Sequence, residues 1–470
     1  MTYPNVLVLG YLNATKTAAP QTQMRAESLV ATGYQRLLTF EAIGGGFSLF
    51  GKVGADVFLS AYGLMQLNDM ARVYPVDPAV IDRSARWLLA HQESSGAWRS
   101  LDYRAGRETT LSTTAFAVWA LADAGRGKEP GVQRGVSYLG ENLAGIDDGY
   151  TLALVANALV AADPKGEATA RALDQLAGLA QHGEKGTYWT AQSTMMGGSG
   201  ATGSVEATAL AAHAFLRAGR QRTLAQEALS FIVRGKDSHG IWGSTQATIW
   251  SLKTLILAAT SGDAGDVRAT VRVSLNGRPA QTLEFTPENA DVVRVMTFDG
   301  VRAGENAVAL EMSGQGSLSY QVTGIYYLPW AVAPRQAEPQ GLLAIEVAYD
   351  RTTLEVDDVA TVNVRARLTQ AGVARMVLLD LGVPPGFAVQ TDDLSALVEK
   401  GVIARYEVTG RQIIVYVENL SSQAVLGFSY RLKARFPLRA KTQQYSGYDY
   451  YNPDQRTTVQ PTLVTVQGET

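Results

Sequence analysis

Cysteine is absent from the 470 residues of this chain. Its absence excludes disulfide bonds, thiolate metal sites and a cysteine nucleophile within the chain. Histidine is scarce, and His91, His182, His213 and His239 lack the short spacings that zinc sites use. We therefore expect neither a metal site nor a bound cofactor.

Strong net charge and long apolar runs are also missing. The formal net charge is −3, so charge predicts no attraction to nucleic acid or to an anionic membrane. No apolar run reaches the roughly 20 residues of a membrane span, and the start lacks the basic residues of a secretory signal. We expect no nucleic-acid partner and no transmembrane segment.

The chain changes its hydrophobic period about halfway along. Residues 3–259 are rich in Ala and Leu at three- and four-residue spacing, which predicts helices. Beyond residue 266 the period is two, and "VSLNGRPA" predicts a hairpin that turns at Asn276 and Gly277. The length exceeds the roughly 250 to 300 residues that one core serves. We predict domains at 1–262 (helical), 263–333 (β segment) and 341–470 (β-sandwich).

Two shorter features lie in the β half. The Pro-rich stretch 328–341 is typical of a linker. One helix is predicted at 392–401, with Asp at its start and Gly at its end.

A loose repeat runs through the helical part. A Gly-containing turn with an aromatic residue precedes an apolar helix, and the aromatic markers are Phe47, Trp98, Tyr150, Trp189 and Trp242. The second helix of each hairpin is apolar nearly all round and must be buried, which favours a closed α/α toroid over an open solenoid. The predicted N-caps of these inner helices are Asp56, Ser112, Ser204 and Ser244. Their N-termini should gather at one end of the ring.

The segment "HQESSGAW" places Gln92, Gly96 and Trp98 in a pattern similar to the QW repeats of triterpene cyclases, which are also α/α toroids. In physical terms the pattern places a glutamine at a helix end and a packed tryptophan on the next turn. We therefore favour a role in holding the structure together over a relationship to the cyclases. A cyclase needs a strong protonating acid, and the sequence has no D-x-D-D motif. The acids in the helical half that remain as candidates are scattered: Glu108, Asp147, Asp148 and Glu206. Glu206 is expected in the first turn of a buried helix.

Several segments, in order, resemble the alpha-2-macroglobulin family and its complement relatives, especially bacterial members. "YPNVLVLGYLN", "GGGFSLFG", "TTLSTTAFAVWAL", "MMGG" and "GSTQATIWSLKTL" are similar to successive parts of the thioester domain. "MVLLDLGVPPGF" and "YSGYDYYNP" are similar to the receptor-binding domain. The fold implied is an α/α toroid of helical hairpins, then a partial β-sandwich (the second half of a CUB-like domain), then a complete C-terminal β-sandwich.

The resemblance implies that the segment like 3–13 follows a G-C-x-E-Q motif, whose Cys and Gln condense into a thioester. We therefore expect this chain to be part of a longer parent, or else a natural form that lost the thioester. The missing first strands of the CUB-like domain point the same way.

The implied function is that of a protease-trapping inhibitor in the periplasm or outside the cell, with proteases as partners through the full-length parent. This chain supplies the platform for entrapment and is not an enzyme. The receptor-type helix carries only Lys400, so vertebrate-type receptor binding is not implied. The alternatives are a non-covalent binding or adhesion protein and, further behind, a cyclase-like toroid enzyme.

The resemblance also implies binding residues around the acyl pocket. Their positions in this sequence are Tyr188, Trp189, Met195, Met196, Glu206, Ser244, Thr245 and Gln246. The aromatic and methionine side chains would keep water from an acyl group.

Overall fold

The computed structural model describes residues 2–15, 20–48, 54–100, 107–236, 241–260, 267–287, 289, 294–316, 318, 320, 322, 324 and 341–468. The chain divides into two compact units. One unit comprises Met1–Met195 with Ser199–Ile325, and the other comprises Met196–Gly198 with Tyr326–Thr470. The predicted linker 328–341 lies outside the described residues except for Gly341.

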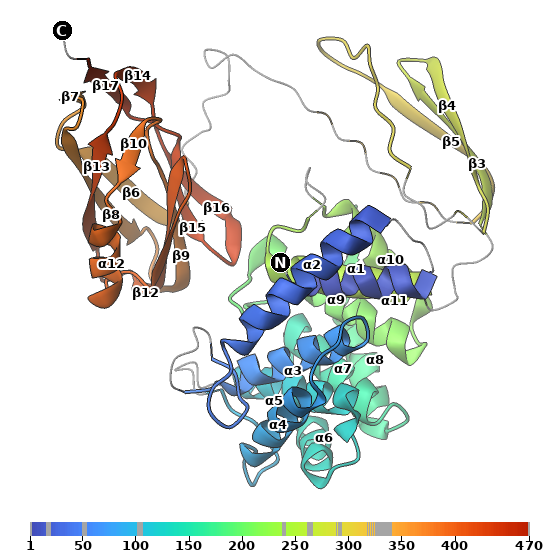
Figure 1. Ribbon diagram of the computed structural model, residues 1–470. Helices are drawn as coiled ribbons and strands as arrows, with labels where there is room; N and C mark the ends of the chain where they lie inside the picture. Colours follow the sequence, from blue (N-terminus) through green and yellow to red (C-terminus); the bar gives the residue numbers. More distant parts are fainter. Residues whose placement is uncertain are drawn as a thin grey trace. The chain divides into compact units, whose positions relative to one another are not determined.

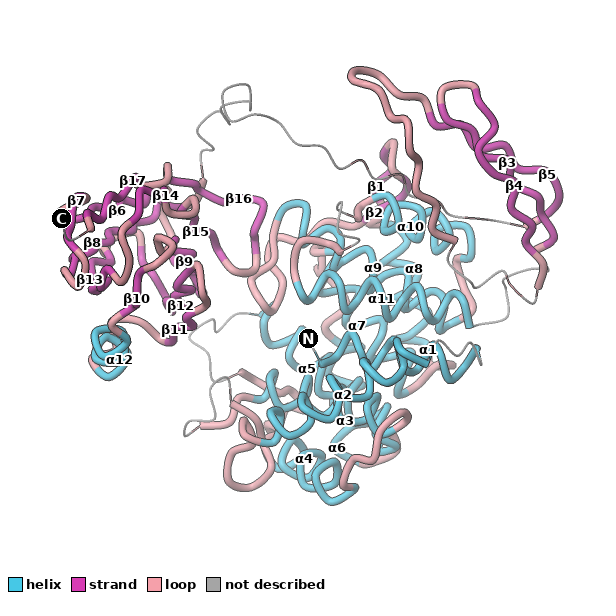
Figure 2. The backbone as a smooth tube through the Cα atoms, turned by 45° about the horizontal axis from the view of Figure 1, so that its top comes forward, coloured by secondary structure: helices cyan, strands magenta, loops and turns pink. Residues whose placement is uncertain are grey.

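The first unit contains a ring of helix pairs (Figures 1 and 2). The inner helices are α1 (Thr2–Thr15), α3 (Val57–Ala71), α5 (Arg107–Leu121), α7 (Gly149–Ala162), α9 (Gly200–Ala218) and α11 (Thr245–Thr260). Each contacts the next in this order, and α1 contacts both α11 and α3, so the ring closes. The outer helices are α2 (Pro20–Leu38), α4 (Pro78–Ala90), α6 (Pro130–Glu141), α8 (Glu167–Gly178) and α10 (Arg222–Arg234). The predicted α/α toroid is confirmed.

Burial explains which helices lie inside. Every residue from Gly149 to Val160 in α7 is buried, so this helix needs neighbours on all sides. The outer helices instead bury one stripe, as α8 does with Thr169, Ala172, Leu173 and Leu176. The remaining elements of this part are the π-helical turn η1 (Ala122–Arg126) and the small hairpin β1 (Gln181–Gly183) and β2 (Gly186–Tyr188).

Three of the five aromatic markers, the tryptophans, join an outer helix to the following inner helix. The indole Nε1 atoms of Trp98, Trp189 and Trp242 donate at 2.6 to 2.7 Å to carbonyls of the preceding outer helix. These carbonyls belong to Leu88, Leu176 and Ile232. The backbone N–H groups of the same tryptophans donate to threonine hydroxyls of the next inner helix, which are Thr114, Thr208 and Thr248. In these three repeats the indole thus adds a hydrogen bond to a carbonyl at the end of the outer helix, and the threonine hydroxyl satisfies the backbone N–H of the tryptophan.

The glutamine of the QW-like segment has the structural role expected of it. Gln92 donates through Nε2 to the carbonyls of Gly96 at 2.9 Å and Gly131 at 2.7 Å, and its Oε1 accepts from Arg134 at 2.7 Å. It therefore ties a turn to the next outer helix.

Two of the four predicted N-caps are confirmed and two are wrong. The Asp56 carboxylate accepts from Leu59 N, and the Ser244 hydroxyl accepts from Ala247 N. Ser112 and Ser204 lie inside α5 and α9, because these helices begin more than a turn earlier. Tertiary burial of residues such as Thr202 outweighs the poor helix propensity of the glycines there.

The β part of the first unit is a three-stranded antiparallel sheet of order β4-β3-β5. Its strands are β3 (Arg268–Leu275), β4 (Arg278–Phe285) and β5 (Val308–Gln315). The predicted hairpin turn is confirmed, with φ of 52° at Asn276 and 76° at Gly277. These left-handed values suit Asn and Gly and match the strand twist.

The second unit is the complete β-sandwich. One sheet has the order β10-β13-β8-β6 and the other β11-β12-β9-β15-β16, and a smaller sheet β14-β17-β7 contains a parallel pair, β17 and β7. Buried side chains from both large sheets share one core, with Val364 and Tyr430 from the first sheet and Leu379 and Val415 from the second.

The strands of this unit are β6 (Leu343–Tyr349), β7 (Thr353–Glu355), β8 (Val359–Leu368), β9 (Val373–Gly382), β10 (Phe387–Val389), β11 (Arg405–Val408), β12 (Gln412–Ser421), β13 (Leu426–Ala434), β14 (Leu438–Lys441), β15 (Tyr445–Asp449), β16 (Asn452–Val459) and β17 (Leu463–Gln467). The predicted helix is α12 (Thr391–Glu399), and Gly401 follows it with φ of 69°. The boundaries at 262, 333 and 341 stay a prediction.

Candidate functional site

A buried carboxyl group lies inside the toroid. The Glu206 side chain is 2% exposed and belongs to the second turn of α9, so the expectation that it lies in the first turn is wrong. No lysine or arginine among the described residues is close enough to compensate its charge. A buried acid without such a partner lowers stability and is a candidate functional group.

Hydroxyl groups from two other segments surround this carboxyl. The Ser244 hydroxyl donates to Glu206 Oε1 at 3.3 Å, and Thr194 also hydrogen-bonds to the carboxyl. Because Ser244 also caps α11, the start of that helix is fixed beside the acid. The site thus joins α9, the N-terminus of α11 and the loop that precedes α9.

The protonation state follows from this environment. Burial raises the pKa of Glu206 from its ordinary 4.5 to about 8, although the hydrogen bonds from Thr194 and Ser244 act to lower it. The carboxyl is therefore mostly uncharged at neutral pH. In that form it can donate a hydrogen bond as well as accept one.

Two tyrosines complete the interior of the site. The Tyr150 hydroxyl accepts from Met195 N at 3.2 Å. The buried Tyr62 hydroxyl lies beside the Gln246 side chain and has no hydrogen bond of ordinary geometry within the described ranges. Burial is the main cause that raises the pKa of both phenols, and the nearby Glu206 carboxyl contributes. Both phenols stay protonated at neutral pH and can donate.

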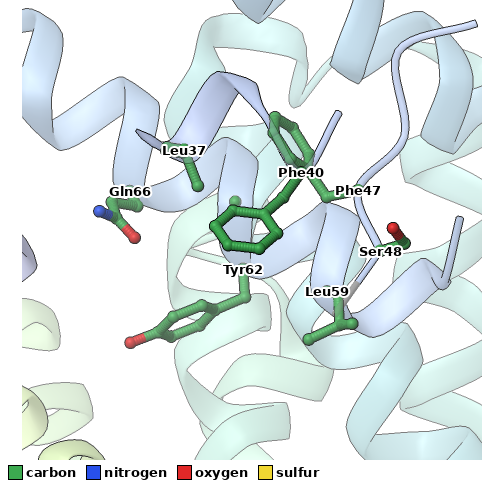
Figure 3. Close-up of a pocket in the computed structure, with 8 residues that line it drawn as sticks. Leu37, Phe40, Phe47, Ser48, Leu59, Tyr62 and Gln66 are labelled. Atoms are coloured by element: carbon green, nitrogen blue, oxygen red, sulfur yellow. The ribbon is translucent and has the colours of Figure 1, made fainter. Parts of the chain in front are cut away.

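An apolar pocket of about 140 Å³ lies on the other side of the Tyr62 ring. It is lined by Phe40, Phe47 and Leu59 among others, and Figure 3 shows the Tyr62 hydroxyl directed away from the two phenylalanines. Tyr62 therefore lines this pocket with its ring, while its hydroxyl lies beside the Gln246 side chain.

The structure brings only part of the predicted site together. Glu206, Ser244 and Gln246 lie close, and Met195 adjoins them through its backbone N–H. Thr245 is exposed at the start of α11 and is not part of the buried cluster. Met196 belongs to the second unit, and its binding role stays a prediction.

The two predicted aromatic residues have other neighbours. Trp189 is fully buried, packs on Phe215 and serves the repeat contact described above. Tyr188 stacks on Phe231 of α10 with ring centroids 5.1 Å apart. The binding role of both residues stays a prediction that rests on the resemblance.

Sequence reasoning missed Tyr62 and Thr194 as site residues, and it named Tyr150 only as a repeat marker. Tyr150 follows the N-cap Asp148 at the start of α7, just as Gln246 follows Ser244 at the start of α11. The repeat therefore contained a usable signal for Tyr150. Asp148 itself is a cap, as its side chain accepts from Thr151 N at 2.8 Å.

The three histidines in the described part of the chain belong to separate contacts. His91 stacks on Trp87, and His182 belongs to the β1–β2 hairpin. His213 is buried against Asn157, and burial lowers the pKa of its imidazole well below the usual range. His239 and the Glu108 side chain lie outside the described residues. Within the described ranges no group of three or more acidic or histidine side chains could hold a metal ion.

Two family models match this chain. The A-macroglobulin TED domain matches residues 1–257, and the A-macroglobulin receptor binding domain matches residues 372–462. Among curated proteins, thioester-containing protein 1 allele S3 from Anopheles gambiae is 23% identical over 465 residues, which are 96% of this chain and 33% of that protein. The chain thus spans about a third of the length of the curated relatives it matches.

Solved structures show the same fold. The structure of native alpha-2-macroglobulin from Escherichia coli, spanning domain MG7 to the C-terminus, has a TM-score of 0.66 at 18% identity. The match covers 98% of this chain and 72% of the Escherichia coli chain. Salmonella alpha-2-macroglobulin reacted with methylamine has a TM-score of 0.65 at 18% identity. The match covers 98% of this chain and 30% of the Salmonella chain. Among the helices that the structure describes, none combines the length and apolar character that a membrane crossing requires.

Proposed function

The chain belongs to the A-macroglobulin family, and on this premise we propose that it is the C-terminal part of a protease-trapping inhibitor. The observation that carries the proposal is the order of the two matched domains, a thioester-type toroid at 1–257 and a receptor-binding-type sandwich at 372–462. Both are found in one chain with a β segment between them, and the match to Escherichia coli alpha-2-macroglobulin covers 98% of this chain.

The chain has no cysteine and cannot build a cysteine–glutamine thioester from its own residues. Its role is therefore that of a platform, in which the toroid holds an acyl group that another segment supplies. The Glu206 cluster supports this role, because uncharged donors in a dry interior bind a carbonyl oxygen without exposing an acyl group to water. The proposed place of action is the periplasm or the cell exterior, where proteases would be met.

Entrapment, unlike blockade of an active site, leaves a captured protease able to cleave small substrates. The test is to capture the native protein from its source cells with an antibody against the sandwich and incubate it with a broad-specificity protease. We expect the protease to be retained, to cleave a short chromogenic peptide and to lose activity on a large protein substrate. A protease that is not retained, or that keeps full activity on the large substrate, would show that the chain serves another purpose, such as adhesion.

A further inference from the structure

A buried ionic cluster holds helix α1 in the ring. Asp69 of α3 accepts hydrogen bonds at 2.7 Å from Lys253 of α11 and at 2.7 Å from the Tyr3 hydroxyl of α1. The Lys253 and Asp69 side chains are only 12% and 10% exposed. The three residues come from the three helices that meet where the ring closes.

The surroundings keep this ion pair dry and charged. The Lys253 ammonium lies 5.7 to 6.0 Å from the ring centroids of Tyr3, Trp119 and Trp250. Burial alone would raise the pKa of Asp69, but Lys253 and the two hydrogen bonds outweigh it and hold the pKa below its usual value.

The three helices contribute unequally. Asp69 and Lys253 carry opposite charges on α3 and α11, whereas α1 contributes only a neutral phenol. Displacement of α3 or α11 would strand a buried charge, which is strongly unfavourable. Displacement of α1 would break two charge-assisted hydrogen bonds, from the Tyr3 hydroxyl to Asp69 at 2.7 Å and from the Lys253 ammonium to the Tyr3 hydroxyl at 3.3 Å, and leave the ion pair intact.

Apolar burial separates α1 from α7, whereas α11 buries only the apolar side chains of Ala247, Ile249 and Trp250, so the distinction between α1 and α11 rests on the ion pair. In α1 the buried side chains are Tyr3, Val6, Leu7 and Leu9, whereas all residues from Gly149 to Val160 of α7 are buried. Elements with fewer buried apolar contacts open locally at lower free energy.

We propose that α1 is the releasable sector of the toroid, so that the ring opens at α1 while its other inner helices stay folded. Opening would also affect the Glu206 site, because the Tyr3 ring packs edge-on against the Tyr62 ring, with the two ring centroids 5.8 Å apart. The Tyr62 hydroxyl lies beside Gln246 at the start of α11, so departure of Tyr3 uncovers that end of the site.

Hydrogen exchange of the full chain, read by mass spectrometry, tests the proposal. In the unmodified chain we expect amides of α1 to exchange by local opening well before those of α7. Tyr3→Phe, which removes only the hydroxyl, should speed exchange in α1 about tenfold to a hundredfold and should also speed it in the first turn of α11. Tyr34→Phe is the matched control. It also removes the hydroxyl of a buried tyrosine, but that hydroxyl accepts a hydrogen bond from Asp77 N at the start of α4.

Lys253→Met tests the unequal roles of the helices. It strands the Asp69 carboxylate, so exchange should rise in α3 and α11 as well as in α1. The proposal is overturned if α1 in the unmodified chain is protected as strongly as α7, a comparison that needs no variant. It is also overturned if Tyr3→Phe speeds amide exchange in α5 and α7 as much as in α1. A third contradicting result is that Lys253→Met speeds amide exchange in α1 alone.

Discussion

The uncharged state of Glu206 makes a quantitative prediction about stability. The acid has a higher pKa in the folded chain than in the unfolded chain, so between pH 4.5 and about 8 the folded state holds a proton that the unfolded state has released. Stability therefore falls as the pH rises through this window and is unaffected by Glu206 below it. Replacing the acid with a neutral isostere should remove the fall.

The perturbation is Glu206→Gln. The interval from the ordinary pKa of 4.5 to pH 7 is 2.5 pH units, and at 1.36 kcal/mol per unit the native acid lowers the free energy of unfolding by about 3 kcal/mol. The variant should accordingly be more stable than the native chain at pH 7 by about 2 to 3 kcal/mol, allowing for imperfect bonding of the new amide. At pH 4.5 the advantage should vanish.

Urea unfolding followed by tryptophan fluorescence at pH 5, 6, 7 and 8 measures this difference, because Trp98, Trp119, Trp189 and Trp250 are buried in the toroid. Glu141→Gln, at the exposed end of α6, is the control and should leave the pH profile unchanged. Parallel profiles of the native chain and Glu206→Gln from pH 5 to 8 would refute the reasoning. A variant less stable at pH 7 would refute it as well.

Three further substitutions test the local structure. Trp98→Phe removes the hydrogen bond from the indole to the Leu88 carbonyl and should lower the free energy of unfolding in urea by about 1 to 3 kcal/mol. A loss of less than about 0.3 kcal/mol would contradict the role of Trp98 in linking the helices. Asp56→Ala removes the cap on Leu59 N and the hydrogen bond from the Ser100 hydroxyl, and should cost about 1 to 2 kcal/mol, with the fastest amide exchange in the first turn of α3. Gly277→Ala places a side chain at φ of 76° and should destabilise the β3–β4 hairpin by about 1 kcal/mol, visible as faster exchange there.

Local patterns predicted much of the fold because they repeat. The tryptophan markers recur with a turn and an apolar helix, and each proved to make the same pair of backbone contacts. The Asn276–Gly277 turn was readable for the same reason, since its chemistry is contained in two residues. The starts of α5 and α9 were not readable, because burial extends these helices through residues with weak helix propensity.

The site and the closing cluster were less accessible to sequence reasoning. Glu206 and Ser244 were identified through the resemblance, but their hydrogen bond spans 38 positions and follows from how α9 and α11 pack. Tyr3 and Lys253 are 250 positions apart, and no spacing rule connects them. Contacts that depend on closure of the ring become visible only when the first and last inner helices are placed side by side.

The most direct test of the central claim, that this chain is the platform of a larger trap, is the intact mass of the native polypeptide captured from its source cells. The account predicts a longer chain with a cysteine-containing segment ahead of Thr2, lighter than its sequence by one ammonia molecule because the thioester has formed. Treatment with methylamine should add the mass of one methylamine molecule. A native polypeptide that begins at Met1 and contains no cysteine would contradict the account.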